Sequence, residues 1–206
     1  MNQAVAALRL HKVAEADFPS LYGGFRIFGF EGVYSGRREE AVALKMGDVA
    51  DGPPPLVRIH SQCLTGDVFH SLRCDCRAQL EISLERIAGE KRGLLVYEHK
   101  EGRGIGLLNK LRAYELQDHG ADTVEANERL GFEADLRNYR LPGEILRYFG
   151  VVEVRLLSNN PMKIQALERA GVKVVERLAC EAPHLESRET YLRTKREKMG
   201  HLLEGL

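Results

Sequence analysis

The sequence lacks an excess of either charge, because its 206 residues carry 30 Lys and Arg against 30 Asp and Glu. A dedicated nucleic-acid or membrane-surface protein usually has a basic excess, so we expect neither partner, although one concentrated basic site is compatible with this balance. No stretch approaches the roughly 18 uncharged apolar residues that a membrane span needs. Tryptophan is also absent, which excludes no class of protein.

The start of the chain lacks the basic flank that a secretory signal has before its apolar run, so we expect no signal peptide and a cytoplasmic location. In that reducing compartment the four cysteines are not expected to form disulfides. Hydrophobic residues at 44% and charged residues at 29% exclude a disordered chain. The chain has no repeat and no linker longer than Pro53–Pro55, so we expect residues 1–206 to form one compact α+β unit.

Apolar periodicity places the expected elements. We expect strands at 24–30, 41–46, 56–60, 94–97, 154–157 and 172–175. We expect helices at 79–90 and 107–117, from Asp122 onward, from Pro161 to near Gly171, and over the charged tail 186–203. Asp122 is expected to cap its helix, since Glu125 follows three residues later.

Three of the four cysteines lie within fourteen residues, at Cys63, Cys74 and Cys76. Zinc prefers thiolate and imidazole ligands, and three protein ligands with one open position are typical of a catalytic site. In an extended segment, Cys74 and Cys76 would project to the same side and suit one ion. Two alternatives remain: three buried thiols without a metal, or a structural zinc closed by His60 or His70.

A glycine-rich stretch over 100–106 follows an expected strand and precedes an expected helix, which suits phosphate binding. Leu107 and Asn109 stand where a dinucleotide fingerprint needs its third glycine, so that motif is excluded. Asp135 beside Arg137 could offer a general base next to a cation. Candidates for holding a polyanion are Arg58, Arg103, Arg112, Arg137 and Lys163, although each one singly could be a solvated surface charge. We expect the fourth cysteine, Cys180, to be an inert core or edge residue.

These motifs together resemble the GTP cyclohydrolase II family, from about residue 10 to the C-terminus. The resemblance is carried by Arg58–Asp67, Ser71–Cys76, Glu101–Arg103, Leu107–Lys110, Ala121–Asn127, Leu130–Phe132, Asp135–Arg137, Ser158–Pro161 and Lys198–Leu203. It implies a mixed β-sheet with flanking helices and hydrolytic opening of the GTP imidazole ring, with release of formate and pyrophosphate. It also implies Mg²⁺ on the triphosphate and a homodimer.

The resemblance implies one Zn²⁺ per subunit on Cys63, Cys74 and Cys76. It assigns Asp135 as proton acceptor and Tyr114 to the neighbourhood of the reacting base. It assigns Arg137 an attack on the α-phosphorus, and electrostatic stabilisation is an equally good role because a neutral guanidine is scarce. The implied substrate contacts are Arg58, Ile59, His60, Ser61, Gln62, Gln79, Glu101, Gly102, Arg103, Thr123, Ser158 and Lys163.

The sequence departs from the family pattern at a few positions. Gln62 replaces the usual glutamate before the first cysteine of the cluster, Arg77 follows the last one, and Ser158 replaces threonine. Two points therefore stay open. The pathway is either riboflavin synthesis or a toxoflavin-type route, and the effect of Gln62 on the rate of GTP hydrolysis is not fixed by the resemblance. The rival hypothesis is a catalytically inactive homologue that binds zinc and nucleotide as a sensor or scaffold.

Overall fold

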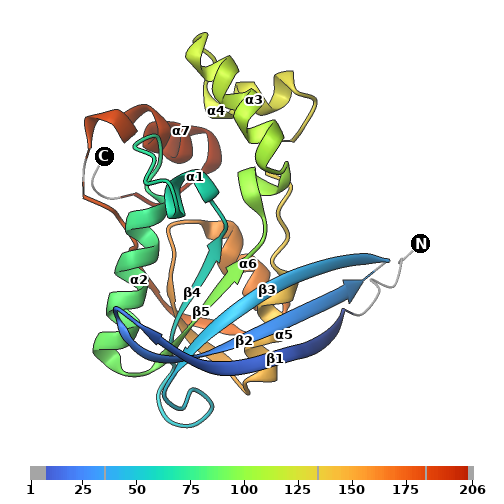
Figure 1. Cartoon of the computed structure of the whole chain (residues 1–206), viewed down its shortest axis with the longest axis vertical. Helices are drawn as coiled ribbons and strands as arrows, with labels where there is room; N and C mark the ends of the chain where they lie inside the picture. Colours follow the sequence, from blue (N-terminus) through green and yellow to red (C-terminus); the bar gives the residue numbers. More distant parts are fainter. Residues whose placement is uncertain (1–7, 35, 134, 184, 204–206) are drawn as a thin grey trace.

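The structure, a computed structural model, describes residues 8–34, 36–133, 135–183 and 185–203 and is built on a seven-stranded sheet (Figure 1). The strand order is β1-β2-β3-β5-β4-β6-β7. The strands are β1 (Arg9–Ser20), β2 (Gly23–Tyr34), β3 (Arg37–Met46), β4 (Leu56–Ser61), β5 (Gly93–Glu98), β6 (Glu153–Leu157) and β7 (Lys173–Leu178). Pairing is antiparallel from β1 through β2 and β3 to β5, and parallel among β5, β4, β6 and β7. The mixed sheet predicted from the sequence is confirmed.

Helices lie on both faces of the parallel half of the sheet and beyond its upper end in Figure 1. They are α1 (Leu64–Asp67), α2 (Cys76–Glu90), α3 (Leu107–Asp118), α4 (Thr123–Arg129), α5 (Arg140–Tyr148), α6 (Pro161–Arg169) and α7 (Glu189–Met199), with 3₁₀ turns η1 (Glu101–Gly104) and η2 (Glu186–Arg188). Within the residues that the structure describes, none of these helices combines the length and apolarity that crossing a bilayer requires.

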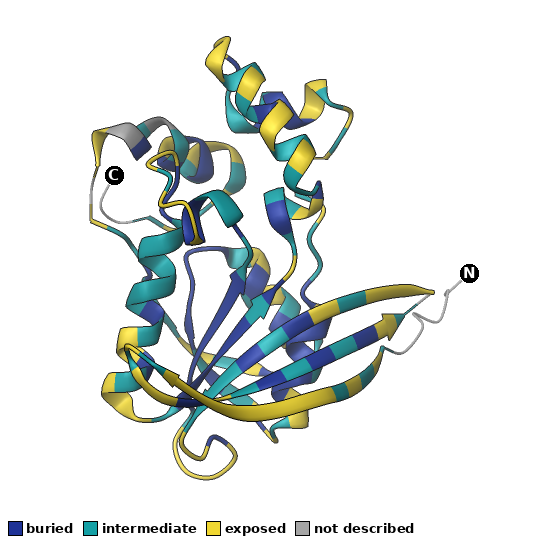
Figure 2. Cartoon of the chain, viewed as in Figure 1, coloured by how far each residue is buried: buried dark blue, intermediate teal, exposed yellow. Residues whose placement is uncertain are grey.

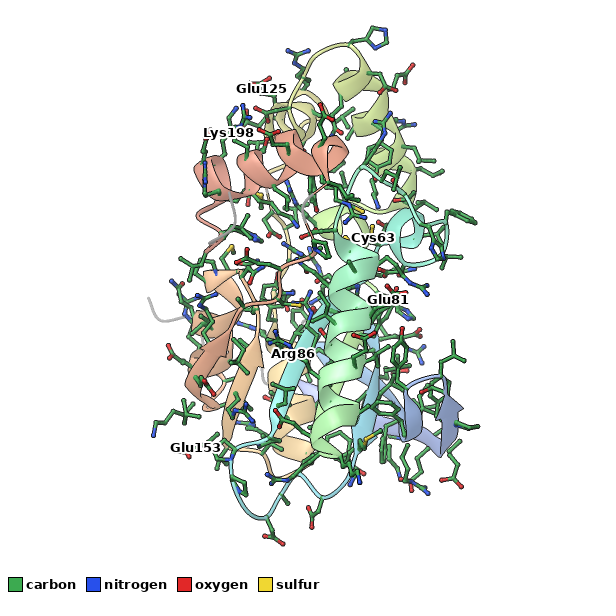
Figure 3. All side chains as sticks on the ribbon, turned by 90° about the vertical axis from the view of Figure 1, so that its left-hand side faces the viewer. Cys63, Glu81, Arg86, Glu125, Glu153 and Lys198 are labelled. Atoms are coloured by element: carbon green, nitrogen blue, oxygen red, sulfur yellow. The ribbon has the colours of Figure 1, made fainter. Side chains whose placement is uncertain are left out.

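The alternation of β4 decides which of its side chains reach the site. Val57 and Ile59 face the core formed with α5 and α6, where they are fully buried. Arg58 and His60 point to the opposite face, which α2 covers. Figure 2 shows β4 and β5 as mostly buried strands, whereas β1 is exposed over most of its length. Polar side chains on β4 are therefore enclosed rather than solvated.

Most expected elements are confirmed, including the capped helix at Asp122. Its carboxylate accepts from the backbone N–H groups of Val124 and Glu125, and the Glu125 side chain accepts from the Asp122 N–H, which completes a capping box. Pro161 begins α6 in its first turn, as expected. The sequence analysis did not anticipate β1, α1 or α5.

Candidate active site and metal centre

A cavity of about 290 Å³ opens at the carboxyl ends of β4, β5 and β6, and α3 and α7 form further walls. In open α/β sheets, ligands bind beyond the carboxyl ends of the strands, where the connecting loops converge. The cavity lining includes the site residues that the family resemblance implies, except Ile59 and Asp135. Ile59 is packed in the core, so it can offer only backbone groups to a ligand.

The three clustered cysteines meet at one end of this cavity. Their sulfur atoms all lie within 4.8 Å of one another, and the Sγ atoms of Cys63 and Cys74 are 3.7 Å apart. A tetrahedral zinc with Zn–S bonds of about 2.3 Å separates its sulfur ligands by about 3.8 Å. The cluster therefore has the dimensions of a thiolate zinc site.

Gly66 packs directly against the sulfur atoms of this thiol cluster. A Cβ atom at this position would lie 2.8 Å from the Cys74 Sγ and 3.1 Å from the Cys63 Sγ. The 2.8 Å contact would force the Cys74 sulfur to move and the 3.1 Å contact is tight, so glycine at this position lets the thiols come together.

One part of the sequence argument for the metal was wrong, and the alternative of a histidine ligand finds no support among the described residues. Cys74 and Cys76 do not lie in an extended segment, because Asp75 has φ −99° and ψ 7° and Cys76 is the first residue of α2. His60 does not join the cluster, since its Nε2 is 3.1 Å from a carboxylate oxygen of Asp67. Among the described residues, the group with suitable ligand atoms consists of the three cysteines, and the exposed His70 lies outside it.

Of the three thiols, Cys63 is the one whose surroundings favour the thiolate. Hydrogen bonds from the Cys74 and Cys76 thiols hold the pKa of Cys63 far below its usual range, and Lys110 adds to this effect. The hydrogen bond to Cys63 raises the pKa of Cys74 to about 11. Lys110 Nζ lies 3.1 Å from the Cys63 Sγ and also donates to Thr65 and Glu101 at 2.9 and 2.7 Å. A buried thiolate beside an ammonium group fits a cation-binding ligand set.

Tyr114 lies on α3 next to this cluster. Its hydroxyl is 3.1 Å from the Thr65 Oγ1, which in turn accepts from Lys110. Burial raises the pKa of Tyr114, so its phenol stays protonated and can donate a hydrogen bond. Tyr114 also lines the cavity, and its role near the reacting base stays a prediction.

Asp135 and Arg137 form a bidentate ion pair, and of the two Arg137 lines the cavity. Arg137 Nη2 is 2.5 Å from one carboxylate oxygen of Asp135 and Nε is 2.8 Å from the other, while Nη1 is 3.4 Å from the Ser61 hydroxyl. Burial raises the pKa of Asp135, but the Arg137 guanidinium more than offsets this and leaves the pKa below its usual range. Burial lowers the pKa of Arg137, yet Tyr139 and Asp135 bring it above the ordinary arginine value.

Arg103 follows β5 in a left-handed backbone conformation with φ 61°. Its two Nη atoms are buried and have no hydrogen-bond partner among the described residues. Burial lowers the pKa of Arg103, and the nearby Arg137 cation adds to the effect. A buried guanidinium with free donors facing a cavity is suited to an anionic ligand, because phosphate oxygens can accept both donors at once.

Lys163 is a second buried cation at the cavity. Its Nζ donates to the Ile59 carbonyl at 2.7 Å. Burial lowers its pKa, and the Arg58 and Arg137 cations lower it further. An anion in the cavity would relieve that repulsion. Arg112, the remaining sequence candidate for anion binding, is exposed, bonds to Asn109 and does not line the cavity.

Several residues of the site were missed by sequence reasoning. They are Asp67, which holds His60; Lys110; Asp75 and Lys195, which form a buried ion pair; and Tyr191 and His201, which line the cavity from the C-terminal segment. Lys110 and Lys195 lie 47 and 120 residues from Cys63 and Asp75, so no local spacing signals these contacts. The available sign was the family resemblance, because Asp67, Asp75, Lys110 and His201 lie within its motifs, whereas Tyr191 and Lys195 do not.

Comparison with known proteins gives consistent matches. Residues 11–179 match the family described as GTP cyclohydrolase II. A GTP cyclohydrolase-2 of Enterobacter sp. (strain 638) is 52% identical over 196 residues, which cover 95% of this chain and 99% of the relative. A GTP cyclohydrolase-2 of Actinobacillus succinogenes is 51% identical over 195 residues, covering 95% of this chain and 89% of the relative.

One solved structure, a two-domain 3,4-dihydroxy-2-butanone 4-phosphate synthase from A. baumannii, is similar with a TM-score of 0.46 and 19% identity. The match covers 88% of this chain but 42% of that chain.

Proposed function

This chain belongs to the GTP cyclohydrolase II family, and we propose that it opens the imidazole ring of GTP by hydrolysis in the cavity at the ends of β4, β5 and β6. The reaction releases formate and pyrophosphate and leaves a diaminopyrimidinone ribosyl phosphate, a step of riboflavin synthesis or of a related toxoflavin-type route. One observation carries this proposal: three thiols that can hold one ion line the same cavity as Arg137, which Asp135 holds in a bidentate ion pair.

Cys63, Cys74 and Cys76 would hold one zinc ion per chain. With three protein ligands and one open position, zinc would lower the pKa of a bound water and so supply a nucleophile at neutral pH. The chain's own residues prepare this site, since Lys110 compensates the charge of the Cys63 thiolate and Gly66 leaves room for the sulfur atoms.

Asp135 is assigned as the proton acceptor. Its pKa below the usual range keeps it ionised at neutral pH, as an acceptor must be. Arg137 keeps its charge because its pKa is above the ordinary value, which supports electrostatic stabilisation of the α-phosphoryl group over nucleophilic attack by a neutral guanidine. Tyr114 would donate its phenolic proton toward the reacting base.

The triphosphate would lie against the buried cations. Arg103 supplies hydrogen-bond donors that have no partner among the described residues. A bound anion would raise the lowered pKa of Lys163 and so restore the positive charge of its ammonium group. Mg²⁺ would accompany the triphosphate without a protein cage of its own, as is usual for nucleotide-bound magnesium. The further substrate contacts are assigned to Arg58, the Ile59 backbone, His60, Ser61, Gln62, Gln79, Glu101, Gly102, Thr123 and Ser158.

We extend the proposal to the protein as a whole. Residues 1–206 would act as one domain, assemble as a homodimer and work in the cytoplasm, where thiol ligands stay reduced. Light scattering on the purified protein tests the dimer, which rests on the family resemblance.

The experiment that tests the function is a product assay. Zinc-loaded protein incubated with GTP and Mg²⁺ is expected to release formate and pyrophosphate in step with GTP consumption. A zinc-loaded preparation that binds GTP and releases neither product would establish the rival, an inactive homologue acting as sensor or scaffold.

A further inference from the structure

We propose that Lys195 of the C-terminal helix α7 is a positioning residue for the metal centre, acting through Asp75. The inference rests on the proposed zinc site and concerns how the ligand loop is held. It makes α7 a structural part of the metal centre, although no ligand comes from that helix.

Lys195 and Asp75 form a buried ion pair between segments 120 residues apart. Lys195 Nζ lies 2.8 Å from the Asp75 Oδ1, and the side chains are 10% and 2% exposed. The ammonium group also lies 4.3 Å from the ring centre of Tyr191, one turn earlier on the same helix. A cation enclosed between a carboxylate and an aromatic ring has little freedom to move.

Asp75 occupies the one position between two ligands. It is the N-cap residue of α2 and lies between Cys74 and Cys76, so any shift of its backbone moves a ligand on each side. Its second carboxylate oxygen, Oδ2, accepts from the Gln79 Nε2 at 2.6 Å. The Gln79 Oε1 accepts from the Arg58 Nη2 at 2.6 Å. Both oxygens of Asp75 are therefore held, one from α7 and one from α2 and β4.

Loss of Lys195 would leave the Asp75 carboxylate buried beside the thiolates without its cation. An uncompensated buried charge is strongly unfavourable, so the segment would rearrange to reach water and carry Cys74 and Cys76 with it. Removal of an outer partner of a metal site commonly weakens metal binding about 10–100-fold. Lys195→Met is expected to fall in this range.

A different role for Lys195 is open to test, because this side chain also lines the cavity. If it served only to contact the triphosphate, its loss would raise KM for GTP and leave zinc affinity unchanged. Zinc affinity measured without GTP separates these two roles.

The experiment compares zinc dissociation constants by competition with a chromophoric chelator, in the absence of nucleotide. Lys195→Met is expected to bind zinc about 10–100-fold more weakly than the wild type, and Lys195→Arg, which keeps the charge, to recover most of that loss. The matched control is Arg193→Met on the same helix, where an exposed pair with Glu189 is removed and zinc affinity should stay within about twofold. Equal affinity for Lys195→Met and wild type would overturn the proposal.

If circular dichroism shows that Lys195→Met is poorly folded, a double-mutant cycle of zinc affinity tests the same proposal. Asp75→Asn alone should weaken zinc binding, and Lys195→Gln should add little in that background because its partner charge is already gone. Fully additive losses would contradict action through Asp75. A wild-type protein that binds no zinc would instead refute the proposed function itself.

Discussion

The β1–β2 hairpin and the carboxyl ends of the parallel strands hold similar charged residues in opposite surroundings. On the hairpin, Arg26 pairs with Glu15 at 2.7 Å and Asp17 at 3.0 Å, and all three side chains are exposed by 36% or more. At the strand ends, the Asp135–Arg137 pair has exposures of 7% and 12%. The nitrogen–oxygen distances of the two sets of ion pairs are similar, but the hairpin pairs lie in water and the Asp135–Arg137 pair lies in the protein interior.

This difference indicates where charge performs a function. Exposed pairs contribute little, since water and salt screen them and side-chain entropy opposes them. Buried pairs carry a desolvation penalty that a protein can avoid by using apolar residues instead. Groups retained despite that penalty, with shifted pKa values and facing a cavity, are candidates for catalysis and ligand binding. The following changes test this contrast in order of expected effect.

The largest effect is expected at the thiol cluster. Cys74→Ser should abolish stoichiometric zinc binding and all ring opening, because a neutral hydroxyl is a poor substitute for a thiolate ligand. Zinc content by atomic emission and formate release measure both. The control is Cys180→Ala, a buried cysteine outside the cluster, which should keep its zinc. Unchanged metal content in Cys74→Ser would remove this residue from the ligand set.

Arg137→Ala should lower the rate of pyrophosphate release by about 10³-fold, because a charge facing the phosphoryl group is lost. Zinc content should change far less, since the Arg137 side chain contacts Asp135 and Ser61 rather than the thiols. Rapid-quench assays of pyrophosphate, with zinc analysis of the same sample, report both. Equal losses of zinc and activity would argue that Arg137 acts on the fold.

Gly66→Ala should weaken zinc binding by about 10–100-fold, because the new methyl group would meet the Cys74 and Cys63 sulfur atoms. Gly89→Ala is the matched control, as a Cβ at that helical position has nothing within 4 Å. It should leave zinc binding unchanged and stabilise α2 slightly. Full zinc affinity in Gly66→Ala would contradict the close fit of Gly66 against the thiol cluster.

Acidification should loosen the C-terminal segment through His201. Burial lowers its pKa to about 3, and nearby cations including Lys195 and Arg137 contribute. The unfolded form takes up a proton near pH 6.5, so stability is complete above that value and falls as pH drops toward 3. Between pH 7.5 and 5 the loss is about 2 kcal/mol.

Hydrogen exchange of the α7 amides at the two pH values measures this loss. His201→Gln should show a smaller difference between them. Equal pH dependence in variant and wild type would assign the effect to other groups.

The smallest effect is expected on the hairpin. Arg26→Ala removes two exposed ion pairs and should shift Tm by no more than about 2 °C, with unchanged zinc content and activity. Calorimetry and the product assay check this. A shift comparable to that of a buried-pair variant would break the contrast between the two regions.

Much of the fold could be predicted where local signals are strong. The strand β4 follows a proline-rich breaker, and α4 begins at a capping box, so both were placed from sequence. The strand β1 escaped because it is an exposed edge strand with little buried alternation. The helix α5 escaped because Pro142 and Gly143 in its first turn resemble a turn, although Ile145 and Leu146 are buried beneath it.

The site, like the fold, could be predicted where the signal is local and not where it depends on tertiary packing. Cysteine clustering and the motifs of the family predicted the ligands and the Asp135–Arg137 pair. The contacts that tune these groups join distant segments, as Lys110 reaches Cys63 and Lys195 reaches Asp75. In sequence alone a lysine that will be buried looks like any solvated lysine, because burial is set by the tertiary packing.

The thiol cluster also has a consequence for the chain between its members. Cys63 lies two residues after β4 and Cys76 starts α2, which packs against the sheet, while Val68, Phe69 and His70 between them are exposed. A shared ion would therefore cross-link this loop much as a disulfide does in secreted proteins, lowering the entropy of the open chain. Loss of the metal would then remove this cross-link and let the already exposed loop around Phe69 open far enough for proteases to cut it before the sheet unfolds.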